Sequence, residues 1–388
     1  MITISTIEKS SLAAALQNKL GTPELEKLKR SAEIAVNTVL KVKKDEQVLI
    51  IANPAPASMS ISASLYDAAS QAGGKPTLLV QPIKTQLDFA EESVIAAFSA
   101  RPEVVLSISA GKLGKDEKGI SEPYQWNGTS YDHVFHLLQY GEKVTRAFWS
   151  PSLTIDSFIR TVPIDYALLK KRALLISEIL NKAESVHVSA PGGTDIRIGL
   201  TGRIAKVDDG DFSAPGSGGN LPAGETFISP ENNTAEGLIV FDGAISVNQG
   251  DILIQEPIRC TVHSGFVTDI TGGAEADALR ETIALAEINA QELYKSGKLS
   301  REKAELYAKN ARNIGEFGIG LNPEAHMSGN MLEDEKAFKT CHFAIGQNYD
   351  EDAPSLIHLD GLVRNPTINA RFSDKSECLI EKDGELLL

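Results

Sequence analysis

Three unbroken apolar runs constrain the fold of this chain more than any other feature of its first half. They are residues 48–52, 78–80 and 104–108, and helix-like stretches lie between them. Strands that are hydrophobic on both faces and alternate with helices are typical of a parallel sheet covered by helices. The pattern therefore predicts an α/β domain at the N-terminal end of the chain.

The helices of this domain are marked by end signals and by apolar spacing. A first helix is predicted at Thr22-Pro23, because proline is favoured in the first turn, and others at 57–72, 91–100 and 170–180. Neither a GxGxxG after the first strand nor a GxxxxGK[ST] is present. Dinucleotide and P-loop chemistry are therefore not supported, and no organic cofactor site is predicted.

The pattern of apolar and polar residues changes near residue 184. Beyond it, short alternating stretches are separated by glycine-rich turns, a pattern typical of antiparallel strands, and one long helix with an apolar stripe covers 279–293. With 388 residues the chain is long enough for two domains. We predict an N-terminal parallel-sheet α/β domain over 1–184. A C-terminal mixed α+β domain over 185–388, with largely antiparallel strands, should carry the functional site.

Charge and cysteine content exclude several classes of protein. The net charge of −14 argues against nucleic acid or an anionic membrane as a partner. The three cysteines are too few for a disulfide framework or a CxxC zinc site. No targeting segment and no membrane-length apolar stretch is apparent, so a cytoplasmic location is expected.

Four side chains that commonly bind metals occur between residues 314 and 360. They are Glu316, His342, His358 and Asp360. Side chains two apart on a strand point to the same face, so His358 and Asp360 should project together. A cluster of imidazole and carboxylate groups is suited to zinc, manganese, cobalt or iron.

Two further motifs extend this candidate site and carry a family resemblance. Glu225 ends Asn-Leu-Pro-Ala-Gly-Glu, and Tyr349 ends His-Phe-Ala-Ile-Gly-Gln-Asn-Tyr, which begins at His342. Together with Gly-Glu316-Phe-Gly-Ile-Gly-Leu-Asn-Pro and His358-Leu-Asp, these motifs resemble the aminopeptidase T family of metallo-aminopeptidases. The resemblance covers most of the second half of the chain.

The resemblance implies a cytoplasmic homodimeric hydrolase that removes N-terminal residues from peptides. Its metal ligands would hold two divalent ions, zinc, cobalt or manganese: Glu225, Glu316, His342, His358 and Asp360. Two divalent ions can activate a water and polarise a peptide carbonyl. Glu316 is expected to act in catalysis, and Tyr349 could donate a hydrogen bond to the oxyanion. Which glutamate bridges the ions and which accepts the proton stays open.

Two alternatives remain beside the aminopeptidase interpretation. The first is a mononuclear iron ring-cleaving dioxygenase, since the 2,5-dihydroxypyridine dioxygenases resemble this scaffold and its Gly-x-Gly-Leu-Asn-Pro loop. In those proteins a histidine precedes the Gly-x-Gly-Leu, where this chain has Glu316. That difference, with five donors in total, favours hydrolysis. The second alternative is a non-catalytic protein in which the metal only stabilises the second domain.

Overall fold

The structure is a computed structural model that describes residues 21–85 and 88–388. The expected absence of a targeting segment concerns residues 1–20, which lie outside the described residues. Two compact units are present. The first runs to Ile164 and includes Gly210–Ala223, and the second consists of Asp165–Asp209 and Gly224–Leu388.

This division differs from the predicted boundary near residue 184, because the chain crosses between the units three times. Helix α8 (Tyr166–Lys182) precedes that point yet packs on strands of the second unit. The segment Gly210–Ala223 returns to the first unit, where it supplies strand β10 (Gly218–Asn220). Contacts between segments far apart in sequence decide the division, and local composition does not record them.

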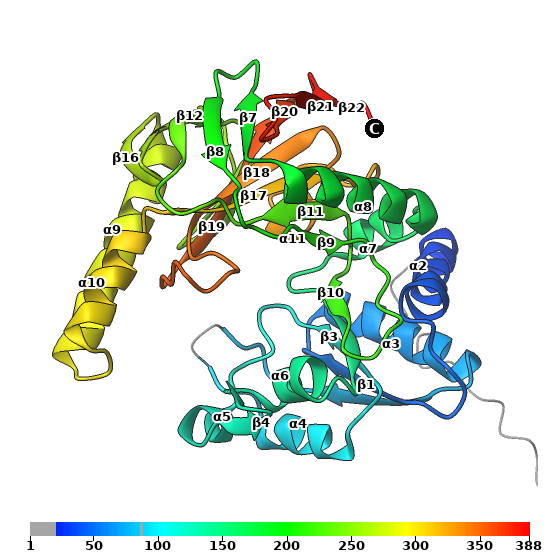
Figure 1. Cartoon of the computed structure of the whole chain (residues 1–388). Helices are drawn as coiled ribbons and strands as arrows, with labels where there is room; N and C mark the ends of the chain where they lie inside the picture. Colours follow the sequence, from blue (N-terminus) through cyan, green and yellow to red (C-terminus); the bar gives the residue numbers. More distant parts are fainter. Residues whose placement is uncertain (1–20, 86–87) are drawn as a thin grey trace, which may run out of the picture. The chain divides into compact units, whose positions relative to one another are not determined.

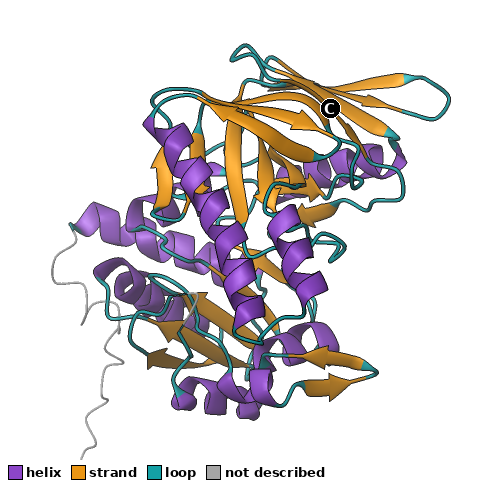
Figure 2. Cartoon of the chain, turned by 90° about the vertical axis from the view of Figure 1, so that its left-hand side faces the viewer, coloured by secondary structure: helices purple, strands orange, loops and turns teal. Residues whose placement is uncertain are grey.

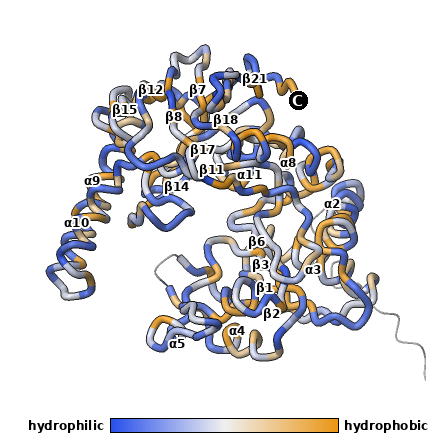
Figure 3. Tube along the Cα trace, viewed as in Figure 1, coloured by the Kyte–Doolittle hydropathy of each residue, from blue (hydrophilic) through white to orange (hydrophobic). Residues whose placement is uncertain are grey.

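The first unit is built on a five-stranded parallel sheet in the order β10-β6-β3-β1-β2 (Figure 1). Its other strands are β1 (Gln47–Ala52), β2 (Lys75–Val80), β3 (Val104–Ile108) and β6 (Arg146–Trp149). The three apolar runs of the sequence fall on β1, β2 and β3, which confirms the predicted parallel sheet. Figure 3 shows β1 in a hydrophobic stretch of the chain.

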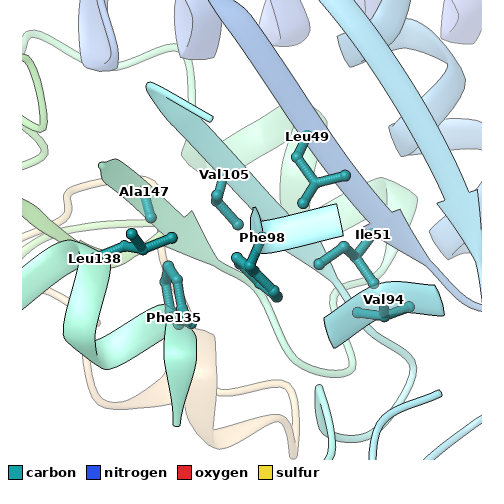
Figure 4. Close-up of a cluster of buried hydrophobic side chains, with 8 residues drawn as sticks. All are labelled: Leu49, Ile51, Val94, Phe98, Val105, Phe135, Leu138 and Ala147. Atoms are coloured by element: carbon teal, nitrogen blue, oxygen red, sulfur yellow. The ribbon is translucent and has the colours of Figure 1, made fainter. Parts of the chain in front are cut away.

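Helices pack on this sheet through a core that Figure 4 shows on one of its faces. Leu49, Ile51, Val105 and Ala147 come from the strands, and the aromatic ring of Phe98 fills the space above them. Alternate strand residues are buried as well, so both faces are covered. The helices and the small hairpin are α2 (Thr22–Ile34), α3 (Pro56–Gln71), α4 (Glu92–Ala97), α5 (Glu117–Ser121), α6 (Val134–His136), α7 (Ile155–Thr161), β4 (Tyr124–Trp126) and β5 (Thr129–Tyr131).

The second unit contains two antiparallel sheets, as the alternating texture of the sequence predicted. The larger has the order β16-β15-β12-β8-β7-β20-β21-β22. Its strands are β7 (Ser185–Ser189), β8 (Asp195–Gly199), β12 (Glu236–Phe241), β15 (Ile258–His263), β16 (Phe266–Thr271), β20 (Thr367–Arg371), β21 (Glu377–Lys382) and β22 (Glu385–Leu386). The smaller, seven-stranded sheet carries the candidate site.

The seven-stranded sheet has the order β14-β13-β19-β18-β17-β11-β9. Its strands are β9 (Lys206–Asp208), β11 (Glu225–Ile228), β13 (Ala244–Val247), β14 (Gly250–Leu253), β17 (Ile314–Gly320), β18 (Thr340–Gly346) and β19 (His358–Arg364). Strands β17 and β18 are buried along their whole length. Polar side chains that point from these central strands are therefore removed from water.

Helices α9 (Ala274–Lys295) and α10 (Arg301–Asn310) pack against each other as an antiparallel pair, visible in Figure 2. The predicted stripe of α9 is buried at Leu279, Ile283 and Ala286. A short helix, α11 (Met331–Asp334), precedes β18. None of the described helices combines the length and apolar character that a membrane span requires.

Candidate metal centre

Four neighbouring strands place the predicted metal ligands side by side. His358 and Asp360 lie on β19, His342 on β18, Glu316 on β17 and Glu225 on β11. Asp360 and Glu316 are both paired with Ala344 of the strand between them, so they stand on one rung of the sheet. The structure thus brings together all five residues that the sequence singled out.

Close approach across the central pair of strands depends on Gly318. His342 is paired with Gly318, and its imidazole lies over the glycine. A Cβ at this position would overlap the His342 ring. From there His342 Nε2 reaches Glu316 Oε1 at 3.1 Å and Glu225 Oε2 at 3.4 Å. The Gly-x-Gly of the sequence motif therefore makes room for a donor on the next strand.

The five residues form two donor groups that share one carboxylate. Glu225, Glu316 and His342 offer one set of atoms, and Glu316, His358 and Asp360 offer the other, each with its ligand atoms within 4.8 Å of one another. His358 Nε2 lies 3.4 Å from Glu316 Oε2 and 3.3 Å from Asp360 Oδ1. Nitrogen and carboxylate oxygen donors at this spacing suit a divalent cation.

Three buried carboxylate oxygens support the interpretation that these groups bind a divalent cation. Glu225 Oε2, Glu316 Oε2 and Asp360 Oδ1 have no hydrogen-bond partner among the described residues, although imidazole nitrogens lie at ion-pair distance. Burying a charged oxygen without a hydrogen bond is unfavourable, and a cation removes that cost. His358 Nδ1 lies 2.8 Å from the Gln347 carbonyl, to which it can only donate, so Nε2 is left as a ligand atom.

The ionisation of these groups shows how strongly positive charge is favoured here. Burial lowers the pKa of His342, but Glu316 and Glu225 raise it to about 9. Burial lowers the pKa of His358 too, yet Asp360 and Glu316 bring it well above its ordinary value. Burial raises the pKa of Asp360, and His358 lowers it to about 2. A divalent cation must therefore displace the protons that these two imidazoles hold.

Tyr349 gives the second donor group an aromatic border. Tyr349 is half exposed as a residue, and its ring lies 5.0 Å from the His358 ring and 5.3 Å from the Phe227 ring, centroid to centroid. Lys206 Nζ donates to the Tyr349 carbonyl at 2.6 Å and lies 5.1 Å from the ring centroid. The tyrosine thus stands beside the donors, at the edge where His358 is partly exposed.

Three charged residues beside the donors were not anticipated from the sequence. Lys336 is fully buried and its Nζ donates to Glu225 Oε1 at 2.6 Å, with Glu335 and Asp208 also close. Lys336 and Glu335 belong to the acidic stretch Glu-Asp-Glu-Lys, which has the composition of a solvated loop. No spacing in the sequence signals that this stretch turns inward.

Three of the five remaining histidines illustrate ordinary structural surroundings. His133 is buried, and its Nδ1 accepts from the backbone of Phe135 at the start of α6. His187 and His263 form surface pairs with Asp195 and Glu236. These residues take no part in either donor group.

Comparison with known proteins points to a different reaction from the one the motifs suggested. The NicX family model, 2,5-dihydroxypyridine 5,6-dioxygenase, matches residues 154–345, just under half of the chain. The 2,5-dihydroxypyridine 5,6-dioxygenase of Pseudomonas putida KT2440 is 29% identical over 171 residues. That match covers 42% of this chain and 41% of the relative, so each protein is matched over less than half its length.

Two solved structures share the fold. The 2,5-dihydroxypyridine dioxygenase of Pseudomonas putida KT2440 superposes with a TM-score of 0.66 and 20% identity, covering 94% of this chain and 97% of the other. AmpT from Thermus thermophilus superposes with a TM-score of 0.61 and 18% identity, covering 94% and 99%. The fold is therefore common to both proteins and does not by itself choose between their reactions.

The aminopeptidase prediction is wrong on these comparisons. The family model and the sequence relative are both described as dioxygenases, so the predicted hydrolase and protease activities are wrong as well. The error has a physical cause. The number of carboxylates indicates that the site can hold a divalent cation, but it does not indicate the reaction, because one fold can support several reactions. The comparisons support an enzyme, and the structure supplies side chains that could hold a metal.

Proposed function

We propose that this protein is a metal-dependent dioxygenase that opens a hydroxylated aromatic ring. The observation that carries the proposal is the match of residues 154–345 to the dioxygenase family model. That segment contains Glu225, Glu316 and His342. His358 and Asp360 lie beyond it in sequence, and the pairing of β18 with β19 brings them to the same place.

The reaction is assigned to the donor group of Glu316, His358 and Asp360. The His358 side chain keeps 24% of its surface exposed, whereas His342 of the other group is fully buried. A substrate and dioxygen can approach only the group that has an exposed edge. The buried group would hold a second ion, and Glu316 would be shared by both.

The proposed reaction restricts which metals can serve at this site. The chemistry that a bound redox-active ion supplies is the activation of dioxygen beside the ring. Zinc does not change its oxidation state, so the proposed reaction needs ferrous iron, manganese or cobalt at the exposed group. Gln347 fixes the His358 imidazole for this task through its carbonyl.

The aromatic border gives the site a means of binding a flat ring. Tyr349 is half exposed as a residue, and the Phe227 ring lies 5.3 Å from its ring, centroid to centroid. Aromatic rings prefer stacked or edge-to-face contacts at such separations. A planar hydroxylated heterocycle could rest on Tyr349 and present its hydroxyl groups to the neighbouring donor group.

Oxygen consumption tests the proposal directly. The purified protein, loaded with ferrous iron without air, is mixed with 2,5-dihydroxypyridine or another dihydroxylated ring, and dioxygen and ring absorbance are followed together. We expect equal amounts of both to disappear, because a dioxygenase places both oxygen atoms in the product. His263→Ala, which changes an exposed histidine, should react like the unmodified protein. No oxygen uptake with any such ring, together with cleavage of an aminoacyl-p-nitroanilide, would overturn the proposal.

A further inference from the structure

Lys336 is a cation buried among carboxylates at the inner end of the candidate metal centre. It follows α11 and has no exposed surface. Its Nζ donates to Glu225 Oε1 at 2.6 Å and to Glu335, and lies 3.9 Å from Asp208 Oδ2. A buried ammonium is unfavourable without partners, and these three carboxylates pair with it.

The contact with Lys336 distinguishes the two oxygens of Glu225. Oε1 is bound by the ammonium, whereas Oε2 faces His342 Nε2 at 3.4 Å and has no hydrogen bond among the described residues. A carboxylate anchored at one oxygen can rotate little. The free oxygen is thereby aimed at the position that it shares with His342 and Glu316.

We propose that Lys336 is a positioning residue for the metal centre, acting through Glu225. It anchors one oxygen of Glu225 so that the other is oriented as a ligand, and it offsets part of the negative charge that the surrounding carboxylates bring. This inference rests on the metal part of the proposed function and is independent of the reaction. Groups that orient metal ligands commonly change metal affinity by about 10- to 100-fold when they are removed.

Cobalt titration of the metal-free protein tests this role, with affinity read from the visible absorption of bound Co²⁺. We expect Lys336→Met to weaken the binding associated with Glu225 by about tenfold or more, and Glu225→Gln to do the same. Because Lys336 acts through Glu225, the double variant should bind no more weakly than Glu225→Gln alone. Lys339→Met removes a nearby exposed lysine that pairs with Glu385, and it should leave the cobalt affinity unchanged.

Thermal unfolding of the metal-free proteins separates positioning from a general loss of structure. The inference is overturned if Lys336→Met folds and binds cobalt with unchanged affinity. It is also overturned if the double variant loses cobalt affinity by the product of the losses in the two single variants. If Lys336→Met does not fold, the double variant still decides, because it does not leave Glu225 as a buried charge without its partner. Affinity equal to that of Glu225→Gln supports the inference, and a further loss of about tenfold overturns it. Failure of the unmodified protein to bind cobalt would instead overturn the metal part of the proposed function.

Discussion

His342 Nε2 lies 3.1 Å from Glu316 Oε1, across the two strands at the centre of the seven-stranded sheet. Glu316 belongs to both donor groups, so this contact joins the exposed and the buried part of the centre. The contact is short because the imidazole crosses Gly318, where no side chain stands in its way. Gly318 therefore leaves His342 the space to reach the carboxylate that the two groups share.

Gly318→Ala should displace His342 and weaken metal binding. The added methyl group would overlap the imidazole, which has no room to move within fully buried strands. We expect cobalt affinity to fall by about tenfold or more and the thermal midpoint to drop. Gly21→Ala is the control, since a Cβ there meets only an ordinary contact with Pro23. Unchanged affinity in Gly318→Ala would show that the ring is placed by other contacts.

Removing a ligand from the exposed donor group should abolish turnover and spare the fold. His358→Ala and Asp360→Ala each take one ligand atom from the group that includes Glu316. We expect oxygen uptake to fall by about 100-fold or more, with far-ultraviolet circular dichroism unchanged, because the sheets have their own apolar cores. His263→Ala provides the matched histidine control. Near-normal turnover in either variant would move the reaction to another part of the protein.

The free energy of unfolding should fall with rising pH because of Glu381. Burial first, and then the charge of Glu385, raise the pKa of this carboxyl to about 8. Below the ordinary value of 4.5 the group is protonated in both folded and unfolded chains and has no effect. As the pH rises from there to about 8, only the unfolded chain releases the proton, so stability declines and the loss is complete above that pKa.

Glu381→Gln removes this titration and should flatten the pH profile. Denaturant unfolding at about pH 5 and about pH 9 should differ by roughly 1–3 kcal/mol less in the variant than in the unmodified protein. Glu377→Gln, on the same strand but exposed, serves as the control. Parallel profiles for Glu381→Gln and the unmodified protein would show that the buried carboxyl has found a partner.

Much of the fold could be predicted because its signals are local. The run at 104–108 coincides with β3, and proline lies in the first turn of α2, as the sequence indicated. The shared face of His358 and Asp360 also follows from strand geometry alone. The spacing of apolar residues and the residues that mark the ends of helices involve neighbours in sequence, so they can be recognised in one sequence alone.

The rest of the site depends on strand order and register, which no local pattern encodes. Glu225 meets the centre because β11 pairs with β17, and Lys336 meets Glu225 because the chain turns inward after α11. The motif match found Glu225, but no pattern marked Lys336. Likewise, no local pattern places Gly218 and Gly219 on the edge strand of the first unit, where they pair with β6.

Two substitutions of Tyr349 distinguish a role in substrate binding from a role in proton donation. If its exposed ring supports a flat substrate, Tyr349→Phe keeps that surface and should leave both kcat and KM nearly unchanged. Tyr349→Ala removes the ring that packs against Phe227 and His358, so KM should rise by about three- to tenfold while kcat changes less. Steady-state oxygen uptake measures both constants. A large loss of kcat in Tyr349→Phe would contradict the stacking role, because only the hydroxyl is missing there, and would make Tyr349 a donor to the reacting atoms.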